Sequence, residues 1–164
     1  MTEAQLSNAM DAYGSTVYRL ALTRMQNIAD AEDVYQEVFL RLWKQAAEDW
    51  DGDRAKAWLI RTTLNRCADL HRFRLRRPVL SFAEIPDLAQ PEDESRELWE
   101  AVSRLPEKAR TAVHLYYAEG YSAEEISQLM HIPAATVRTR LHRARKQLKE
   151  LLGGIDDETC VSRS

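Results

Sequence analysis

Cationic side chains that can bind the phosphates of a nucleic acid gather in residues 134–146 of this 164-residue chain. Five arginines and lysines stand there, whereas Val137, Leu141 and Ala144 recur at the spacing of a single helix face. We therefore expect an amphipathic helix that packs by its apolar face and exposes its cations. A basic helix alone can also lie on a partner protein or a membrane, so the preceding residues decide between these uses.

A second helix is expected immediately before the basic one. Ser122 can cap its first turn and Glu125, three residues later, can reach back to the cap, which makes a capping box. The sequence His-Ile-Pro at residues 131–133 ends this helix, because proline lacks a backbone donor and restricts the residue before it. Two helices joined by a short turn, the second of them basic, are typical of a helix-turn-helix with a DNA recognition helix. His131 stands where such a turn often requires a positive φ, so we expect a small stability cost there.

The net charge of −3 hides two basic segments in an otherwise acidic chain. Residues 61–78 carry +5 and residues 131–150 carry +5, whereas residues 1–60 carry −4 and residues 79–100 carry −6. Local positive patches, rather than the total charge, capture phosphates. Two separate nucleic-acid contacts are therefore expected.

Composition and cysteine usage exclude several classes of protein. A hydrophobic content of 45% and a charged content of 30% are typical of a soluble globular chain, and no apolar run approaches the length of a membrane span. The first residues form no secretory signal. Cys67 and Cys160 lie far apart and suggest no disulfide framework, which favours a reducing cytoplasm.

We expect neither an enzyme nor a metalloprotein. The sequence contains no glycine-rich phosphate loop and no nucleophile elbow. Cys67 and His71 share a helix face at i, i+4 and could begin a zinc site, but no second ligand pair with metal-like spacing follows. A buried cysteine beside a surface histidine is the favoured interpretation, so no cofactor, metal ligand or catalytic residue is predicted.

The hydrophobic pattern predicts an all-α chain. Long runs of alternating residues are missing, and five glycines leave few hairpin turns. Thr2 and Gln5 can cap a first helix, which Gly14 can interrupt, and Asn27 marks the following turn. Helices are expected over about residues 2–25, 30–44, 54–77 and 106–120.

Composition also indicates two small helical domains. Residues 79–95 hold Pro86, Pro91 and five acids without a single base, which is typical of a linker. The end of the chain from Gly153 has no helical pattern, and we expect it to be disordered. The predicted organisation is a first domain over 1–78, a linker over 79–95, a helix-turn-helix domain over 96–152 and a tail over 153–164.

The earlier basic segment combines cations with aromatic side chains. Trp58 and Phe73 accompany its arginines, and such mixtures suit unstacked single-stranded bases better than a closed duplex. The simpler alternative is a core tryptophan on a solvated basic helix. Only the helix-turn-helix predicted further along the chain, which would bind duplex DNA, makes this alternative less favoured. One face at i, i+4, i+8 and i+11 consists of Arg61, Asn65, Asp69 and Arg72.

Three ordered groups of residues resemble sigma-70-family transcription initiation factors. Residues 30–43, DAEDVYQEVFLRLW, are similar to region 2.2 of that family, and residues 57–72 are similar to its regions 2.3 and 2.4. Residues 105–107, 120–122 and 136–145 resemble region 4. A chain with only these two regions and a short linker resembles the extracytoplasmic-function (ECF) group.

The resemblance implies a bacterial cytoplasmic protein that binds core RNA polymerase and directs initiation at chosen promoters. Residues 30–44 would dock on the clamp helices of the β′ subunit, and the second domain would meet the β flap. Loop 45–56 and the first basic helix would read the −10 element as it melts, while the recognition helix would read the −35 element as a duplex. An anti-sigma factor is expected to cover these surfaces, and it could hold the protein at the membrane without any insertion of this chain.

The resemblance also assigns residues to each contact. Core polymerase would be bound by Asp30, Asp33, Gln36, Glu37, Leu40, Arg41 and Trp43. The −10 strand would be bound by Trp58, Arg61, Asn65, Arg66, Asp69 and Arg72. Bases of the −35 element would meet Arg138, Thr139, His142 and Arg143, and its phosphates would meet Arg140, Arg145 and Lys146. Tyr35, where the family usually has an aliphatic residue, and His131, where it usually has glycine, depart from the pattern.

Two other functions fit parts of the sequence. A LuxR-like helix-turn-helix regulator would use a similar DNA-binding motif, but it would need a receiver domain with strands in the first half of the chain. A protein- or RNA-interaction module could use the basic helices without any polymerase. Binding to core polymerase and promoter-specific initiation separate the sigma-like function from both alternatives.

Overall fold

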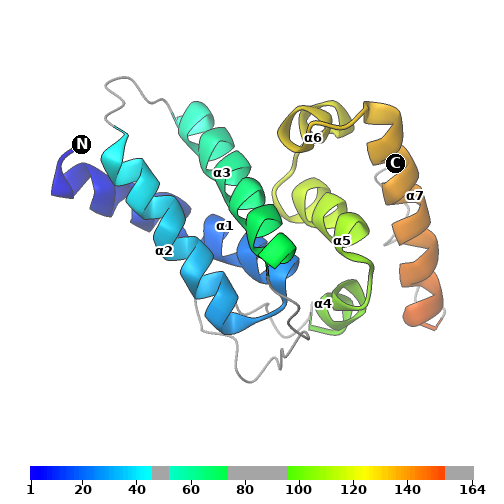
Figure 1. Cartoon of the computed structure of the whole chain (residues 1–164). Coiled ribbons are helices and arrows are strands. Elements are labelled where there is room, and N and C mark those ends of the chain that lie inside the picture. The colour runs from blue at the N-terminus through cyan, green and yellow to red at the C-terminus, as the bar shows by residue number, and fades with distance from the viewer. Residues whose placement is uncertain (46–51, 74–95, 154–164) are drawn as a thin grey trace. The chain divides into compact units, whose positions relative to one another are not determined.

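The computed structural model describes residues 1–45, 52–73 and 96–153. Every regular element in these ranges is helical, which confirms the predicted all-α fold (Figure 1). The chain divides into two compact units, residues 1–90 and 91–164. The predicted linker 79–95 lies outside the described residues, as does the predicted tail 153–164 except for Gly153, so the predicted domain boundaries stay predictions. No helix in the described ranges is long and apolar enough to cross a bilayer.

The first unit consists of α1 (Glu3–Met25), α2 (Ile28–Lys44) and α3 (Gly52–Phe73). The predicted cap of α1 is confirmed, because the Thr2 hydroxyl accepts the Gln5 N–H at 3.2 Å and the Gln5 side chain accepts the Thr2 N–H at 2.8 Å. Asn27 caps α2 by accepting the Asp30 N–H at 3.0 Å. Since the described part of this unit contains helices and no strand, it does not provide the receiver domain that a LuxR-like regulator needs.

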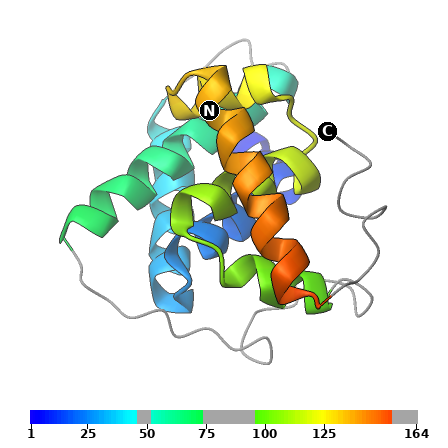
Figure 2. The same ribbon diagram turned by 90° about the vertical axis from the view of Figure 1, so that its right-hand side faces the viewer.

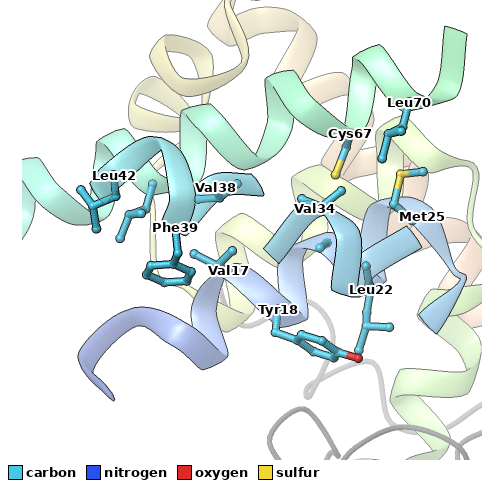
Figure 3. Packing of buried hydrophobic residues seen from close by; sticks show 13 residues of the cluster. Val17, Tyr18, Leu22, Met25, Val34, Val38, Phe39, Leu42, Cys67 and Leu70 are labelled. Atoms are coloured by element: carbon cyan, nitrogen blue, oxygen red, sulfur yellow. The ribbon is translucent and has the colours of Figure 1, made fainter. Parts of the chain in front are cut away.

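Apolar side chains from all three helices meet in the core of the first unit. Val17 and Leu22 of α1, Val34 of α2, and Cys67 and Leu70 of α3 are all buried in one cluster (Figure 3). Burial of a valine or leucine side chain contributes about 1.5–3 kcal/mol, so this cluster is the main stabilising interaction between the helices. The buried position of Cys67 fits the interpretation that it is a core residue rather than a metal ligand.

Gly14 lies within α1 and does not interrupt it, so that expectation was wrong. The glycine instead makes room for Tyr35 of α2, whose hydroxyl oxygen lies 3.1 Å from the position that a Cβ atom would take at residue 14. The ring of Tyr35 packs on Phe39, with centroids 4.8 Å apart, and meets the edge of Tyr18 at 6.0 Å. Burial, with a smaller effect from the Asp11 carboxylate, raises the pKa of Tyr35.

The second unit contains α4 (Arg96–Ser103), α5 (Glu107–Val113), the π-helical segment η2 (His114–Ala118), α6 (Ala123–Met130) and α7 (Ala134–Leu151). In Figure 2 the orange helix α7 passes in front of α5, on which it packs. Leu115, Ile126 and Val137 are fully buried and join η2, α6 and α7. Each unit thus has apolar residues of its own that hold its helices together.

The helix expected over residues 106–120 changes its hydrogen-bonding pattern before it ends. Pro106 is the N-cap residue, so the helix begins one residue later than expected, and Gly120 adopts φ +76° at the predicted end. Between them, η2 widens to π-helical bonding, and the N–H of Glu119 donates to the carbonyl oxygen of His114 at 3.2 Å. Sequence periodicity did not predict this segment, because a π turn occupies only a few residues inside an otherwise regular helix.

The contact between Gly14 and Tyr35 gives a measurable coupling. Gly14→Ala alone should gain little stability or lose some, because the new methyl group would press on the Tyr35 hydroxyl. In a Tyr35→Phe background, which removes only that oxygen, the same change should stabilise the chain by about 1 kcal/mol through helix propensity. Urea unfolding of the four variants followed by circular dichroism measures the difference. Equal effects of Gly14→Ala in the two backgrounds would contradict the close contact.

Candidate functional site

The position of α7 depends on the turn that precedes it. The predicted capping box is present, because the Ser122 hydroxyl accepts the Glu125 N–H and the Glu125 carboxylate accepts the Ser122 N–H, each at 3.1 Å. His131 adopts φ 56° and ψ 45°, so the expected left-handed residue is confirmed. The Ser127 hydroxyl donates to the Ile132 carbonyl oxygen at 2.5 Å, which ties the end of α6 to the turn. These contacts together define how the chain enters α7.

The packing of α7 decides which of its side chains reach solvent. Its four buried side chains are Val137, Leu141, Ala144 and Leu148, and the helix contacts α5 and α6. The predicted apolar face is therefore confirmed. The opposite side exposes three cations, Arg138, Arg143 and Lys146, together with the polar residues Thr139 and His142, and we call these five residues the cationic row.

Two of the cations predicted to bind phosphate are not part of this row. Arg140 is half-buried. Arg145 donates its Nε–H to the Tyr117 hydroxyl at 2.7 Å, and its guanidinium lies 5.7 Å and 5.9 Å from the ring centroids of Tyr116 and Tyr117. A cation held in this way stabilises the contact between η2 and α7. The geometry therefore does not support the predicted phosphate contact of Arg145, and nothing local in the sequence distinguishes it from Arg143.

One member of the cationic row has an acidic partner on the other helix of the motif. Glu124, in the first turn of α6, accepts a hydrogen bond from Nη2 of Arg138. Both side chains remain more than half exposed, at 62% for Glu124 and 58% for Arg138. This ion pair joins the two helices of the motif across 14 residues of sequence.

The predicted face of α3 is exposed at most of its positions. Arg61, Asn65 and Arg72 are exposed, and Asp69 is partly exposed. Nη1 of Arg72 lies 3.9 Å from Oδ1 of Asp69, a weak surface ion pair within the same face. The loop predicted to work with this face lies outside the described residues over 46–51, as does the side chain of Phe73.

Two residues predicted to bind the −10 strand lie deeper in the unit. Trp58 is partly buried and packs on the hydrophobic core of the first unit. Arg66 is also partly buried, and its Nε atom is not accessible to solvent. The simpler interpretation of Trp58 as a core residue therefore agrees with its position.

The surface predicted to bind polymerase is exposed over most of α2. Leu40 and Trp43 are 47% and 38% exposed, whereas most large apolar side chains among the described residues are buried or partly buried. Asp33, Gln36 and Arg41 are exposed beside them, and Nε of Arg41 lies 3.1 Å from Oε1 of the partly buried Glu37.

Asp30 does not belong to this surface, and its assignment is corrected. Its exposed fraction is only 1%, because it stands one helical turn before the fully buried Val34 and shares the face of α2 that points to the core. The i, i+4 spacing between these two residues was visible in the sequence and could have indicated burial.

A shallow groove of about 430 Å³ lies between α1 and α2 next to the exposed apolar side chains. Leu40 and Trp43 form part of its wall, and Tyr35 and Phe39 also line it. The wall on α1 includes Leu6 and Met10, which sequence reasoning did not select. The contribution of α1 depends on the packing of two helices, so no spacing within α2 could have indicated it.

A second apolar pocket, of about 240 Å³, lies within the second unit between α4, η2 and α7. Leu98, Trp99 and Val102 of α4 line it, together with Tyr117 and Leu148. His114 is buried at its wall, with Nε2 3.7 Å from Oε1 of Glu119. Sequence reasoning missed this pocket, because its lining residues come from helices that are far apart in the sequence.

His71, which shares a helix face with Cys67, takes part in the packing of the first unit. Nε2 of His71 lies 3.1 Å from the Arg24 carbonyl oxygen, so this side chain links α3 to the end of α1. Residues 1–45, 52–73 and 96–153 contain no cluster of three or more histidine, cysteine or acidic residues that could hold a metal ion.

Comparisons with known proteins agree with this arrangement of two units. Residues 9–77 match the family described as Sigma-70 region 2, and residues 95–148 match Sigma-70, region 4. The ECF RNA polymerase sigma factor SigM of Bacillus subtilis is 32% identical over 155 residues, which are 89% of this chain and 94% of that protein. SigE of Mycolicibacterium smegmatis, another ECF RNA polymerase sigma factor, is 34% identical over 161 residues, which are 92% of this chain and 62% of that protein.

A solved structure supports the same relationship. The sigma factor RpoE in complex with the anti-sigma factor NepR from Bartonella quintana has a TM-score of 0.70 and 25% identity to this chain, covering 92% of this chain and 95% of that chain. The chain belongs to the sigma-70 family of RNA polymerase sigma factors, in its ECF group.

The left-handed residue in the helix-turn-helix gives a stability prediction. Because a non-glycine residue pays a conformational cost at positive φ, His131→Gly should stabilise the chain by about 1 kcal/mol. His131→Ala removes the same exposed side chain without relieving the backbone, so it should leave stability nearly unchanged. Urea unfolding monitored by circular dichroism compares the two variants. If both variants shift the midpoint equally, the backbone of His131 is not the source of the cost.

Proposed function

We propose that this chain binds core RNA polymerase and selects promoters by reading the −35 element as a duplex and the −10 element as a melted strand. The match to sigma regions 2 and 4, in a chain whose α7 exposes a row of cations, carries this proposal. The same match disfavours a LuxR-like regulator and a general interaction module, since neither combines these two regions.

The exposed surface of α2 would bind the clamp helices of the β′ subunit. Leu40 and Trp43 present apolar area, and the charged residues Asp33 and Arg41 surround it. An apolar centre with a polar rim is the usual composition of a protein interface, and buried aromatic residues often supply most of its affinity. The groove between α1 and α2 extends this surface to Leu6 and Met10, which we add to the proposed contact.

The apolar pocket of the second unit would receive the β flap. It is lined mainly by apolar and aromatic side chains, and Leu98 at its wall is 43% exposed. A helical segment with an apolar face can fit a hydrophobic groove between helices. This assignment would give each unit of the chain its own contact with the polymerase.

The exposed face of α3 would meet the melted −10 strand. Arg61 and Arg72 can neutralise backbone phosphates, while Asn65 can hydrogen bond with an unpaired base. Asp69 would keep Arg72 oriented rather than contact the strand itself, because the two side chains lie within ion-pair distance.

The cationic row of α7 would enter the major groove at the −35 element. Arg138 and Arg143 can each donate two hydrogen bonds to O6 and N7 of guanine, and Thr139 and His142 stand beside them on the same exposed side. Lys146, nearer the end of the helix, would bind a phosphate and so position the helix without reading sequence.

An anti-sigma factor would be the natural regulator of these surfaces. The solved structure of RpoE with NepR contains a complex of this kind, and this chain matches the sigma factor of that complex over nearly its whole length. We propose that such a partner covers the exposed apolar side chains of α2 until the chain is released to the polymerase.

Binding to core polymerase tests the proposal directly. Leu40→Ser should weaken the complex by about tenfold, because a half-exposed apolar residue at the centre of the interface would be lost. Leu151→Ser is a matched control, since Leu151 is 41% exposed and lies at the end of α7. Sedimentation of the full chain with bacterial core polymerase measures affinity, and selection of initiated transcripts measures promoter choice. A chain that never joins the polymerase, or joins it without redirecting initiation, would refute the proposal.

The two kinds of contact on α7 should separate in DNA-binding measurements made with the holoenzyme. Arg143→Ala should cost about 1–3 kcal/mol at the preferred −35 element and relax sequence preference, because a base contact is lost. Lys146→Ala should weaken preferred and scrambled −35 elements alike and reduce the salt dependence of binding. Equal losses on both DNAs for both variants would contradict the division into base and phosphate contacts.

A further inference from the structure

The acidic residue Glu124 faces the cationic row, although it has no part in capping its own helix. Ser122 and Glu125 already exchange both hydrogen bonds of the capping box. Glu124 directs its carboxylate across the turn to Nη2 of Arg138 instead. An acidic side chain in a first helical turn stabilises its own helix, but this role does not explain why the Glu124 side chain points to Arg138.

The ion pair adds little to folding. Both partners are more than half exposed, and exposed ion pairs are screened by solvent and by salt. The ion pair matters more for the orientation of Arg138 than for the stability of the fold. The carboxylate fixes one nitrogen of a planar guanidinium that has five N–H donors. The remaining donors keep a defined direction, whereas an unheld arginine loses side-chain entropy when it binds a base.

Arg138 differs in this respect from its neighbours on the row. Within the described part of the chain, Arg143 and Lys146 make no ion pair, and both are exposed. A carboxylate beside Arg138 also lowers the local positive potential, which weakens attraction to the phosphates of any DNA. Weaker attraction to phosphates lowers the affinity for non-specific DNA, and a better oriented arginine favours binding to the preferred sequence. Both effects raise the ratio of specific to non-specific binding.

We propose that Glu124 is a positioning residue that sets the sequence discrimination of the −35 contact by holding Arg138. This inference rests on the proposed reading of the −35 element by α7. It concerns a residue of α6 that would act through the arginine and need not touch a base. Loss of the carboxylate would leave the helix-turn-helix folded, because the capping box and the buried face of α7 do not include it.

The test uses holoenzyme assembled from the full chain and core polymerase. Binding is measured on a preferred −35 element, on its single-base variants and on scrambled DNA. Glu124→Gln keeps the shape of the side chain and removes its charge, and Glu150→Gln makes the same charge change at an exposed position near the end of α7. We expect Glu124→Gln to reduce discrimination by about fivefold at one or two base positions and to raise affinity for scrambled DNA. Glu150→Gln should leave discrimination unchanged.

A second pair of variants shows whether the effect passes through the arginine. In an Arg138→Ala background, Glu124→Gln should change discrimination no further, because there is no guanidinium left to hold. Unchanged discrimination in Glu124→Gln, or the same loss in both backgrounds, would overturn the inference. Wild-type holoenzyme is measured in the same series. If the wild-type holoenzyme shows no −35 preference, the proposed function itself fails. If the wild type discriminates and Glu124→Gln discriminates equally well, only the inference about Glu124 fails.

Discussion

The burial of one face of α7 against α5 and α6 fixes the rotation of that helix about its own axis. Val137, Leu141 and Ala144 would each have to leave an apolar environment if the helix turned by one residue, and Arg138 would move toward the core. Burying an unpaired guanidinium is far more costly than exposing a methyl group. Packing therefore decides which cations face outward, and electrostatics decides only what they meet there.

The π-helical segment has a similar influence on a different set of residues. An ordinary α-helix separates consecutive side chains by about 100° around the axis, and a π turn changes this spacing locally. Here Tyr116 and Tyr117 lie with ring centroids 4.8 Å apart, and Arg145 packs on both. Tyr117 of η2 thus both accepts a hydrogen bond from Arg145 and lines the apolar pocket.

The features that sequence predicted well are those whose partners lie within a few residues. The capping boxes at Thr2 and Ser122 join residues three apart, and the left-handed His131 occupies the turn position at which a positive φ was expected. The apolar stripe of α7 was equally visible, because a helix repeats its contacts every three or four residues. Fold class and the approximate ends of most helices followed from these short-range patterns.

Contacts between distant residues could not be predicted in the same way. Arg145 and Tyr117 are 28 residues apart, and the groove beside Leu40 needs Leu6 and Met10 from another helix. The periodicity of a single segment does not predict such contacts, because they depend on how the helices pack. The burial of Asp30, in contrast, could have been predicted, because its place one helical turn before Val34 is visible within a single segment of the sequence.

The fit between Gly14 and Tyr35 limits the order in which these two positions can change over evolution. An alanine that arose first at residue 14 would contact the tyrosine hydroxyl closely. If the hydroxyl at residue 35 were lost first, the alanine methyl group would find the space that it needs. Descendants of this chain should therefore reach a more helix-favouring residue at 14 by way of a change at 35. On the reverse path the new methyl group presses on the tyrosine hydroxyl, so the benefit of the change at 14 depends on whether the change at 35 has already occurred.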